Sequence, residues 1–84
     1  MIQYIDFFVT AHNAYSRERV KFALSSMKSA GTVKKWTEQE DDETTHFSIK
    51  GAWTAYSTIL AMIPKKITSE TKLLISIEHF EDDN

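Results

Sequence analysis

Residues 32–51, TVKKWTEQEDDETTHFSIKG, decide the fold. Thr32–Glu38 contains the β-branched Val33 and the aromatic Trp36 and predicts a strand, and Thr44–Gly51 predicts a second one. The acidic run Glu40–Glu43 between them predicts a turn, so the segment as a whole predicts a β-hairpin. Alternate residues of the second strand face opposite sides: Phe47 and Ile49 on one, and His46, Ser48 and Lys50 on the other.

A helix is predicted on each side of this hairpin, over Arg17–Ala30 and Ala52–Ile63. Ser16 or Asn13 is expected to cap the first helix, Gly31 to end it, and Pro64 to stop the second. The apolar stripes that face the core are Val20, Ala23, Leu24 and Met27 in the first helix, and Tyr56, Ile59, Leu60 and Ile63 in the second, with Trp53 on the flank.

The outermost segments, Ile2–Val9 and Lys72–Phe80, predict the two remaining strands. The residues expected to point into the core are Ile5, Phe7, Val9, Leu73, Ile75 and Ile77. Those expected on the opposite face are Tyr4, Asp6, Phe8, Leu74, Ser76 and Glu78.

The resulting order, β-α-β-β-α-β, predicts an α+β, ferredoxin-like fold: a four-stranded antiparallel sheet with two helices on one face. The other face of the sheet is then open, with Tyr4, Phe8 and Leu74 exposed on it. An apolar surface of this kind is unusual for a monomer, so we expect a second copy or another partner to cover it.

The 84 residues are expected to form a single domain, with 81–84 as a frayed tail. Twenty of them are Leu, Ile, Val or Phe, which is enough for a folded chain but makes a small core, so a homodimer is expected. The absence of cysteine excludes disulfides and thiolate zinc sites and fits a cytoplasmic location. No apolar run is long enough to span a membrane, and the first residues do not read as a signal peptide.

Charge is segregated along the chain, although the net charge is only −2. Residues 1–36 carry +4, residues 37–43 carry −5, residues 44–77 carry +3 and the tail carries −4. A basic body therefore has an acidic loop and an acidic tail. These either keep a small domain soluble, or they bind a basic groove on a partner while the basic body meets a polyanion.

No motif in the sequence indicates catalysis. The two glycines cannot build a phosphate-binding loop, and the histidines lack metal-ligand spacing, so no cofactor and no metal are expected. The most polar cluster is His12–Arg19, where helix N–H groups and arginines could bind an anion, although an ordinary helix cap explains the same residues. Asp6 is expected to be an exposed sheet residue or a partner of Lys50.

The sequence thus predicts a small non-enzymatic regulatory protein, an inhibitor or an antitoxin-like protein of the kind that phages and mobile elements encode. It would act by occupying a macromolecular partner. The residues expected to form the partner or dimer surface are Tyr4, Phe8, Leu74, Glu40, Asp41, Asp42 and Glu43.

The alternative prediction is an RNA-binding or single-stranded nucleic-acid-binding protein. Such proteins combine positive charge with aromatic side chains on which bases stack. Tyr4 and Phe8, with Trp36 as a third candidate, would supply the aromatic rings. The basic residues expected to bind phosphate are Arg17, Arg19, Lys21, Lys34, Lys35 and Lys50.

Overall fold

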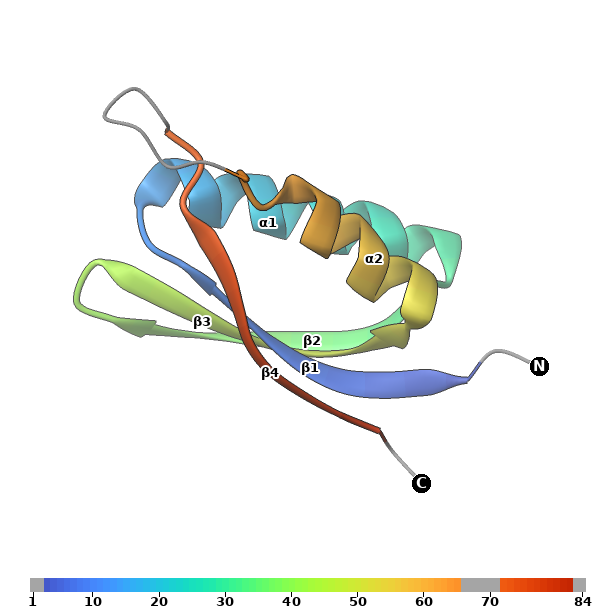
Figure 1. Cartoon of the computed structure of the whole chain (residues 1–84). Coiled ribbons are helices and arrows are strands. Elements are labelled where there is room, and N and C mark those ends of the chain that lie inside the picture. Colours follow the sequence, from blue (N-terminus) through green and yellow to red (C-terminus); the bar gives the residue numbers. More distant parts are fainter. Residues whose placement is uncertain (1–2, 66–71, 83–84) are drawn as a thin grey trace.

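Four strands form one antiparallel sheet, and two helices lie together on one of its faces, in a computed structural model that describes residues 3–65 and 72–82 (Figure 1). This confirms the predicted α+β class and the predicted order of elements. The elements are β1 (Tyr4–Ala11), α1 (Ala14–Ala30), β2 (Val33–Asp41), β3 (Thr44–Ala52), α2 (Trp53–Met62) and β4 (Ile75–Asp82).

The strands lie in the order β2-β3-β1-β4, and each neighbouring pair is antiparallel. Helix α1 connects β1 to β2 across the intervening β3, and α2 connects β3 to β4 across the intervening β1. The central strands are therefore β1 and β3, whereas β2 and β4 form the two edges of the sheet.

The ends of α1 follow from local chemistry. Asn13 is the N-cap, and its Oδ1 accepts a hydrogen bond of 2.7 Å from the backbone N–H of Ser16. Of the two predicted caps, Asn13 is therefore the one used, and the helix begins three residues before the predicted Arg17. Gly31 ends the helix as predicted, in the left-handed conformation (φ 88°) that glycine adopts without a steric penalty.

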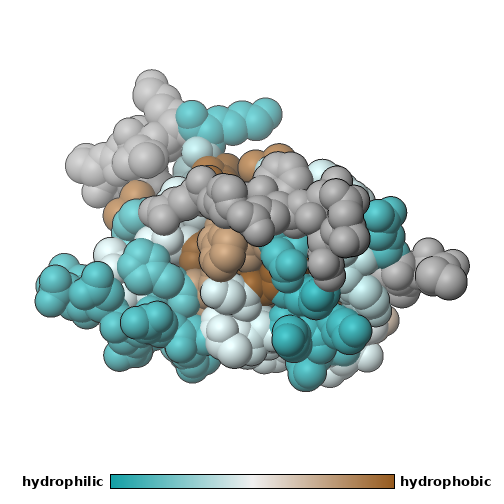
Figure 2. Space-filling view, turned by 90° about the horizontal axis from the view of Figure 1, so that it is seen from below, coloured by the Kyte–Doolittle hydropathy of each residue, from teal (hydrophilic) through white to brown (hydrophobic). Residues whose placement is uncertain are grey.

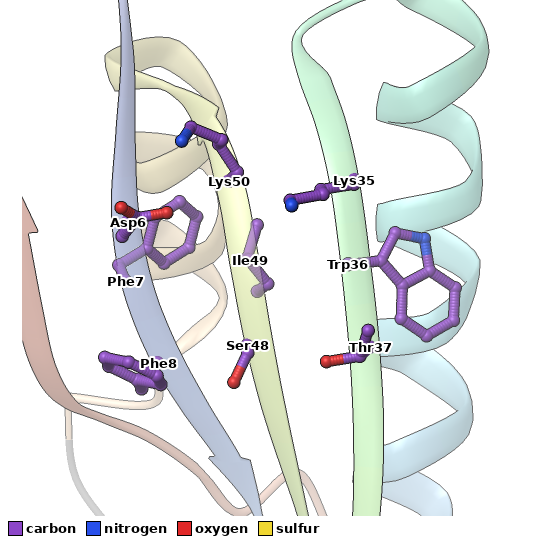
Figure 3. A pocket seen from close by; sticks show the side chains of 9 residues that line it. All are labelled: Asp6, Phe7, Phe8, Lys35, Trp36, Thr37, Ser48, Ile49 and Lys50. Atoms are coloured by element: carbon purple, nitrogen blue, oxygen red, sulfur yellow. The ribbon is translucent and has the colours of Figure 1, made fainter. Parts of the chain in front are cut away.

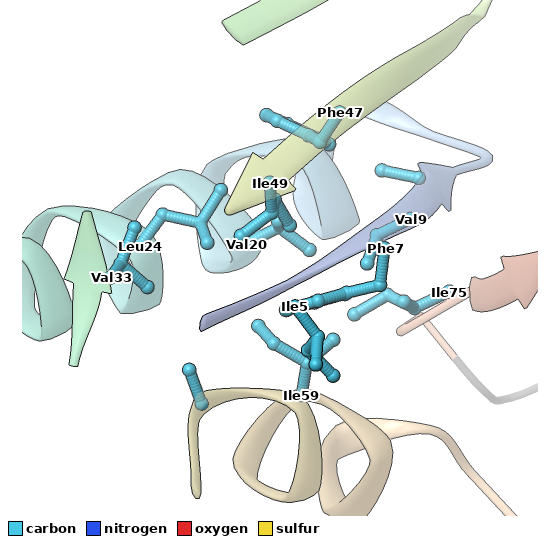
Figure 4. Packing of buried hydrophobic residues seen from close by; sticks show 12 residues of the cluster. Ile5, Phe7, Val9, Val20, Leu24, Val33, Phe47, Ile49, Ile59 and Ile75 are labelled. Atoms are coloured by element: carbon cyan, nitrogen blue, oxygen red, sulfur yellow. The ribbon is translucent and has the colours of Figure 1, made fainter. Parts of the chain in front are cut away.

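The core lies between the sheet and the two helices (Figure 4). Ile5, Phe7 and Val9 of β1 have no exposed surface, which confirms the predicted alternation along this strand. The predicted stripe of α1 also packs inward, with Val20 and Leu24 completely buried. The other buried side chains of the core include Val33, Phe47, Ile49, Ala55, Ile59 and Ile75.

The predicted stripe of helix α2 is confirmed at Tyr56, Ile59 and Ile63, which pack in or against the core. It is wrong at Leu60, which is 49% exposed, whereas Ala55 is buried. The close approach of α2 to β3 explains this choice, since a Cβ at Gly51 would lie only 3.2 Å from that of Ala55. Only a small side chain fits at this point of the helix, so Ala55 rather than a leucine marks the buried face.

Several strand boundaries also differ from the prediction, and β1 continues to Ala11, two residues beyond the predicted Val9. Glu40 and Asp41 belong to β2 and pair with Thr45 and Thr44, so the predicted acidic turn is reduced to its last two residues. Strand β4 begins at Ile75, three residues later than predicted, and continues to Asp82. The backbone of Leu74, just before it, is bonded to the start of α1: its N–H donates to Ser16 Oγ (2.6 Å) and its carbonyl accepts from the N–H of His12 (2.9 Å).

Ser16 is therefore expected to stabilise the fold through its buried hydroxyl. In Ser16→Ala, the Leu74 N–H loses its acceptor, which should lower the free energy of unfolding by about 1–3 kcal/mol. Ser25→Ala is the matched control, because Ser25 is exposed on the same helix, and it should change stability by less than about 0.5 kcal/mol. Urea denaturation of both variants measures the difference, and equal stabilities would contradict this role of Ser16.

Candidate functional site

The face of the sheet opposite the helices is open, and its centre is apolar. Phe8 is 38% exposed there, and Tyr4 and Asp6 of the same strand are half-buried. Seen from below the sheet, hydrophobic surface gathers in the middle of the molecule and hydrophilic surface flanks it on both sides (Figure 2). We call this surface, which carries the side chains of β1, β2 and β3 that point away from the helices, the open face.

A depression of about 340 Å³ lies on the open face across three strands (Figure 3). The strand register explains its composition, because residues paired across neighbouring strands share a face. One row runs from Asp6 through Lys50 to Lys35, and the next runs from Phe8 through Ser48 to Thr37. An aromatic ring is thereby placed beside two lysines and two hydroxyl groups.

Lys34 extends this basic surface because of an irregularity in β2. The register with β3 shifts between Val33 and Lys35, so two consecutive lysines reach the outside of the sheet. The Nζ of Lys34 lies 5.7 Å from the centre of the Tyr4 ring, a cation–π distance. The Tyr4 hydroxyl in turn donates to the carbonyl of Gly31 (3.3 Å), which fixes the ring.

The same irregularity removes Trp36 from the open face. Strict alternation from the buried Val33 would direct the indole away from the helices, but the shift directs it toward them. Its ring centre lies 5.9 Å from that of Phe47, and the side chain packs against the core. The prediction that Trp36 is available for base stacking is therefore wrong, as Figure 3 also shows.

The remaining predicted basic residues lie on α1. Arg17 contacts Glu40 of β2 (Nη1 to Oε1, 3.3 Å) and Glu18 (Nε to Oε2, 3.1 Å). Lys21 Nζ lies 3.3 Å from Glu38 Oε1, also on β2. Arg19 is exposed on the helix. The structure thus brings Lys34, Lys35 and Lys50 to the open face and leaves the cations of α1 on the helical layer.

The cluster at His12–Arg19 does not have the geometry of an anion site. Its polar groups are used within the fold, by the Asn13 cap and by the bond from Ser16 Oγ to the Lys72 carbonyl (3.4 Å). A second depression, of about 360 Å³, lies beside Arg17. Three carboxylates border it, those of Glu40, Asp42 and Glu43, and they would repel an anion.

Two histidine contacts at the other end of the open face were not predicted. His12 Nε2 lies 2.9 Å from Ser76 Oγ, and His46 Nδ1 lies 3.0 Å from Thr10 Oγ1. The pairing of Thr10 with both His46 and Ser76 in the sheet brings these side chains together. A serine–histidine contact also needs an orienting acid to act as a triad, so it does not by itself indicate catalysis. Within residues 3–65 and 72–82, no group of three His, Asp or Glu side chains is placed to hold a metal ion.

The predicted partner surface is only partly contiguous. Tyr4 and Phe8 lie on the open face, but Leu74 precedes β4, is half-buried and lies next to the start of α1. The acidic residues Glu40–Glu43 are exposed at the tip of the β2–β3 hairpin. They lie beyond the Gln39–His46 pair, at the end of the sheet that is distant from Tyr4.

Comparisons with protein-family models, with curated proteins and with solved structures found no match. Neither of the helices in the described ranges has the length and apolar character needed to cross a bilayer.

Substitutions of Phe7 and Phe8 are expected to differ in their effect on the free energy of unfolding, because the two residues are adjacent but face opposite sides of the sheet. Phe7→Ala should lower the free energy of unfolding by about 3–5 kcal/mol, since the ring is completely buried. Phe8→Ala should cost only about 1–2 kcal/mol, because part of its surface already contacts water. Urea denaturation compares them, and an equal or larger loss for Phe8→Ala would show that the open face is part of the core.

Proposed function

We propose that this chain is a non-enzymatic binding protein that occupies a macromolecular partner with its open face, in the manner of an inhibitor or regulator. The depression beside Phe8 is the observation that supports this most directly. It combines a partly exposed aromatic ring with the side chains of Lys35 and Lys50, and it lies on strands instead of a loop. Aromatic side chains, phenylalanine included, are enriched in protein interfaces, and charged groups around them select partners of opposite charge.

We further propose that the fold is ferredoxin-like. Two interleaved strand-helix-strand units support this, because each helix crosses over one strand of the other unit. The arrangement places both helices on one face, and so it leaves the opposite face of the sheet available for a partner.

The charge of the open face favours an acidic or phosphate-bearing partner. Three lysines surround its aromatic residues, and among the side chains that the structure describes Asp6 is the carboxylate that lines the depression with them. The acidic hairpin tip lies at the far end of β2, so the two signs are separated along the length of the strand. A partner that binds across the depression would meet the lysines and avoid the carboxylates of the tip.

Phe8→Asp is therefore expected to abolish partner binding, because it places a second carboxylate beside Asp6 and removes the aromatic contact. Phe22→Asp is the matched control, since Phe22 is 72% exposed but belongs to α1 on the opposite side of the molecule. Affinity purification from the native host with quantitative mass spectrometry measures the outcome. The partners recovered with wild type and Phe22→Asp should be lost with Phe8→Asp. If all three recover the same partners, the open face is not the binding surface.

A second candidate partner is single-stranded nucleic acid, which the Lys34–Tyr4 contact favours. Stacking on Tyr4 or Phe8 and phosphate contacts from Lys34, Lys35 and Lys50 would together form such a surface. The aromatic and basic residues of this set lie on β1, β2 and β3, so a strand could cross the sheet and contact each in turn.

Double replacement of Lys35 and Lys50 by alanine is expected to weaken the binding of labelled single-stranded RNA and to reduce its salt dependence. Each lost phosphate contact should reduce the slope of log affinity against log salt by about 0.7, so the pair should reduce it by about 1.4. Fluorescence anisotropy at low and physiological salt measures this, with Arg19→Ala and Lys28→Ala as controls on α1. Absence of binding at low salt, or an equal loss in the controls, would exclude this candidate.

A further inference from the structure

The outer edge of β2 carries opposite charges at its two ends. β2 has one neighbour in the sheet, β3, so its other edge meets no strand among the described residues. The strand begins with Lys34 and Lys35 and ends with Glu38, Glu40 and Asp41, and each of these residues is exposed. The sign of the charge changes only once along the strand, near Thr37.

Two copies of this strand are complementary in charge when they run antiparallel to each other. Antiparallel pairing about Thr37 places Lys35 of one copy opposite Gln39 of the other, with Asp41 on the diagonal and on the same face. Lys34 comes level with Glu40, although Lys34 faces Tyr4 on the open face and Glu40 faces Arg17 on the helical side. A two-fold axis repeats each pair, as in an isologous interface. We propose that β2 pairs antiparallel with β2 of a second copy, so that the two sheets join into one.

Charges on an edge strand commonly prevent pairing, and the distribution of signs decides whether they do so here. Pairing in parallel would place lysine against lysine and carboxylate against carboxylate, whereas antiparallel pairing brings opposite signs together.

The helical side of the β2 edge is also suited to a second strand. Lys21 and Arg17 of α1 contact Glu38 and Glu40, which reduces the repulsion between carboxylates near the axis. Trp36 is half-buried against Phe47 on this side and lies at the edge itself. A second strand would cover more of its indole ring and add apolar contact to the hydrogen bonds between the strands.

The test uses two variants that give both ends of the β2 edge the same charge. Lys34→Glu combined with Lys35→Glu gives an acidic edge, and Glu40→Lys combined with Asp41→Lys gives a basic one. We expect wild type to sediment as a concentration-dependent dimer and each variant alone to dimerise about tenfold more weakly or worse. An equimolar mixture of the two variants should recover a heterodimer, because opposite charges then meet at both ends of the paired strands.

Matched variants keep this test interpretable. Lys35→Glu and Asp41→Lys, tested singly and as a mixture, leave the Arg17–Glu40 and Lys34–Tyr4 contacts in place, and circular dichroism verifies their folding. Arg19→Glu changes charge on the helical layer and should leave dimerisation unchanged. Phe8→Asp should also leave it unchanged, which separates this proposal from the binding role of the open face.

Three results would overturn edge pairing. The first is a wild-type chain that stays monomeric at all concentrations accessible to sedimentation. The second is a dimer whose affinity is the same in the charge variants, or whose variants do not recover it on mixing. The third is a dimer that Phe8→Asp dissociates, since the interface would then be the open face.

Discussion

The structure depends on β1, one of the two strands that are paired on both sides. Its hydrogen bonds to β3 and β4 fix the direction of every side chain along it, so Ile5, Phe7 and Val9 enter the core while Asp6 and Phe8 reach the open face. A shift of one residue would exchange these two sets and expose the core. The same constraint that builds the core therefore places the candidate binding residues, and neither can change without the other.

Much of the fold could be predicted because it follows local rules. The alternation of β1 and β3, the apolar stripe of α1 and the glycine that ends this helix each involve a few neighbouring residues, and the structure confirms them. The wrong predictions concern side chains whose direction depends on contacts with residues that are distant in the sequence. The register shift in β2 turns Trp36 toward the core, and the tight approach at Gly51 places Ala55, and not Leu60, among the buried residues of α2.

The candidate site was predicted in part for the same reason. Lys50 and Phe8 follow from alternation, and Lys34 and Lys35 from their place in the predicted hairpin. The contacts of Arg17 and Lys21 with β2 depend on how α1 crosses the sheet, which no local pattern specifies. A count of basic residues therefore overestimates the cationic surface, because Arg17 and Lys21 already contact carboxylates of the neighbouring strand.

Pairing of β2 between two copies and binding of a partner by the open face would reinforce each other. A two-fold axis perpendicular to the joined sheet keeps the helices of both copies on one side and both open faces on the other. Lys35 and Thr37 line the depression and belong to β2, so the depressions of the two copies would lie on either side of the axis. An elongated anionic partner could then contact both at once, and the second contact would form at a high effective concentration. A single small face with three lysines would bind such a partner weakly, whereas the doubled face explains how a chain of this size could hold it.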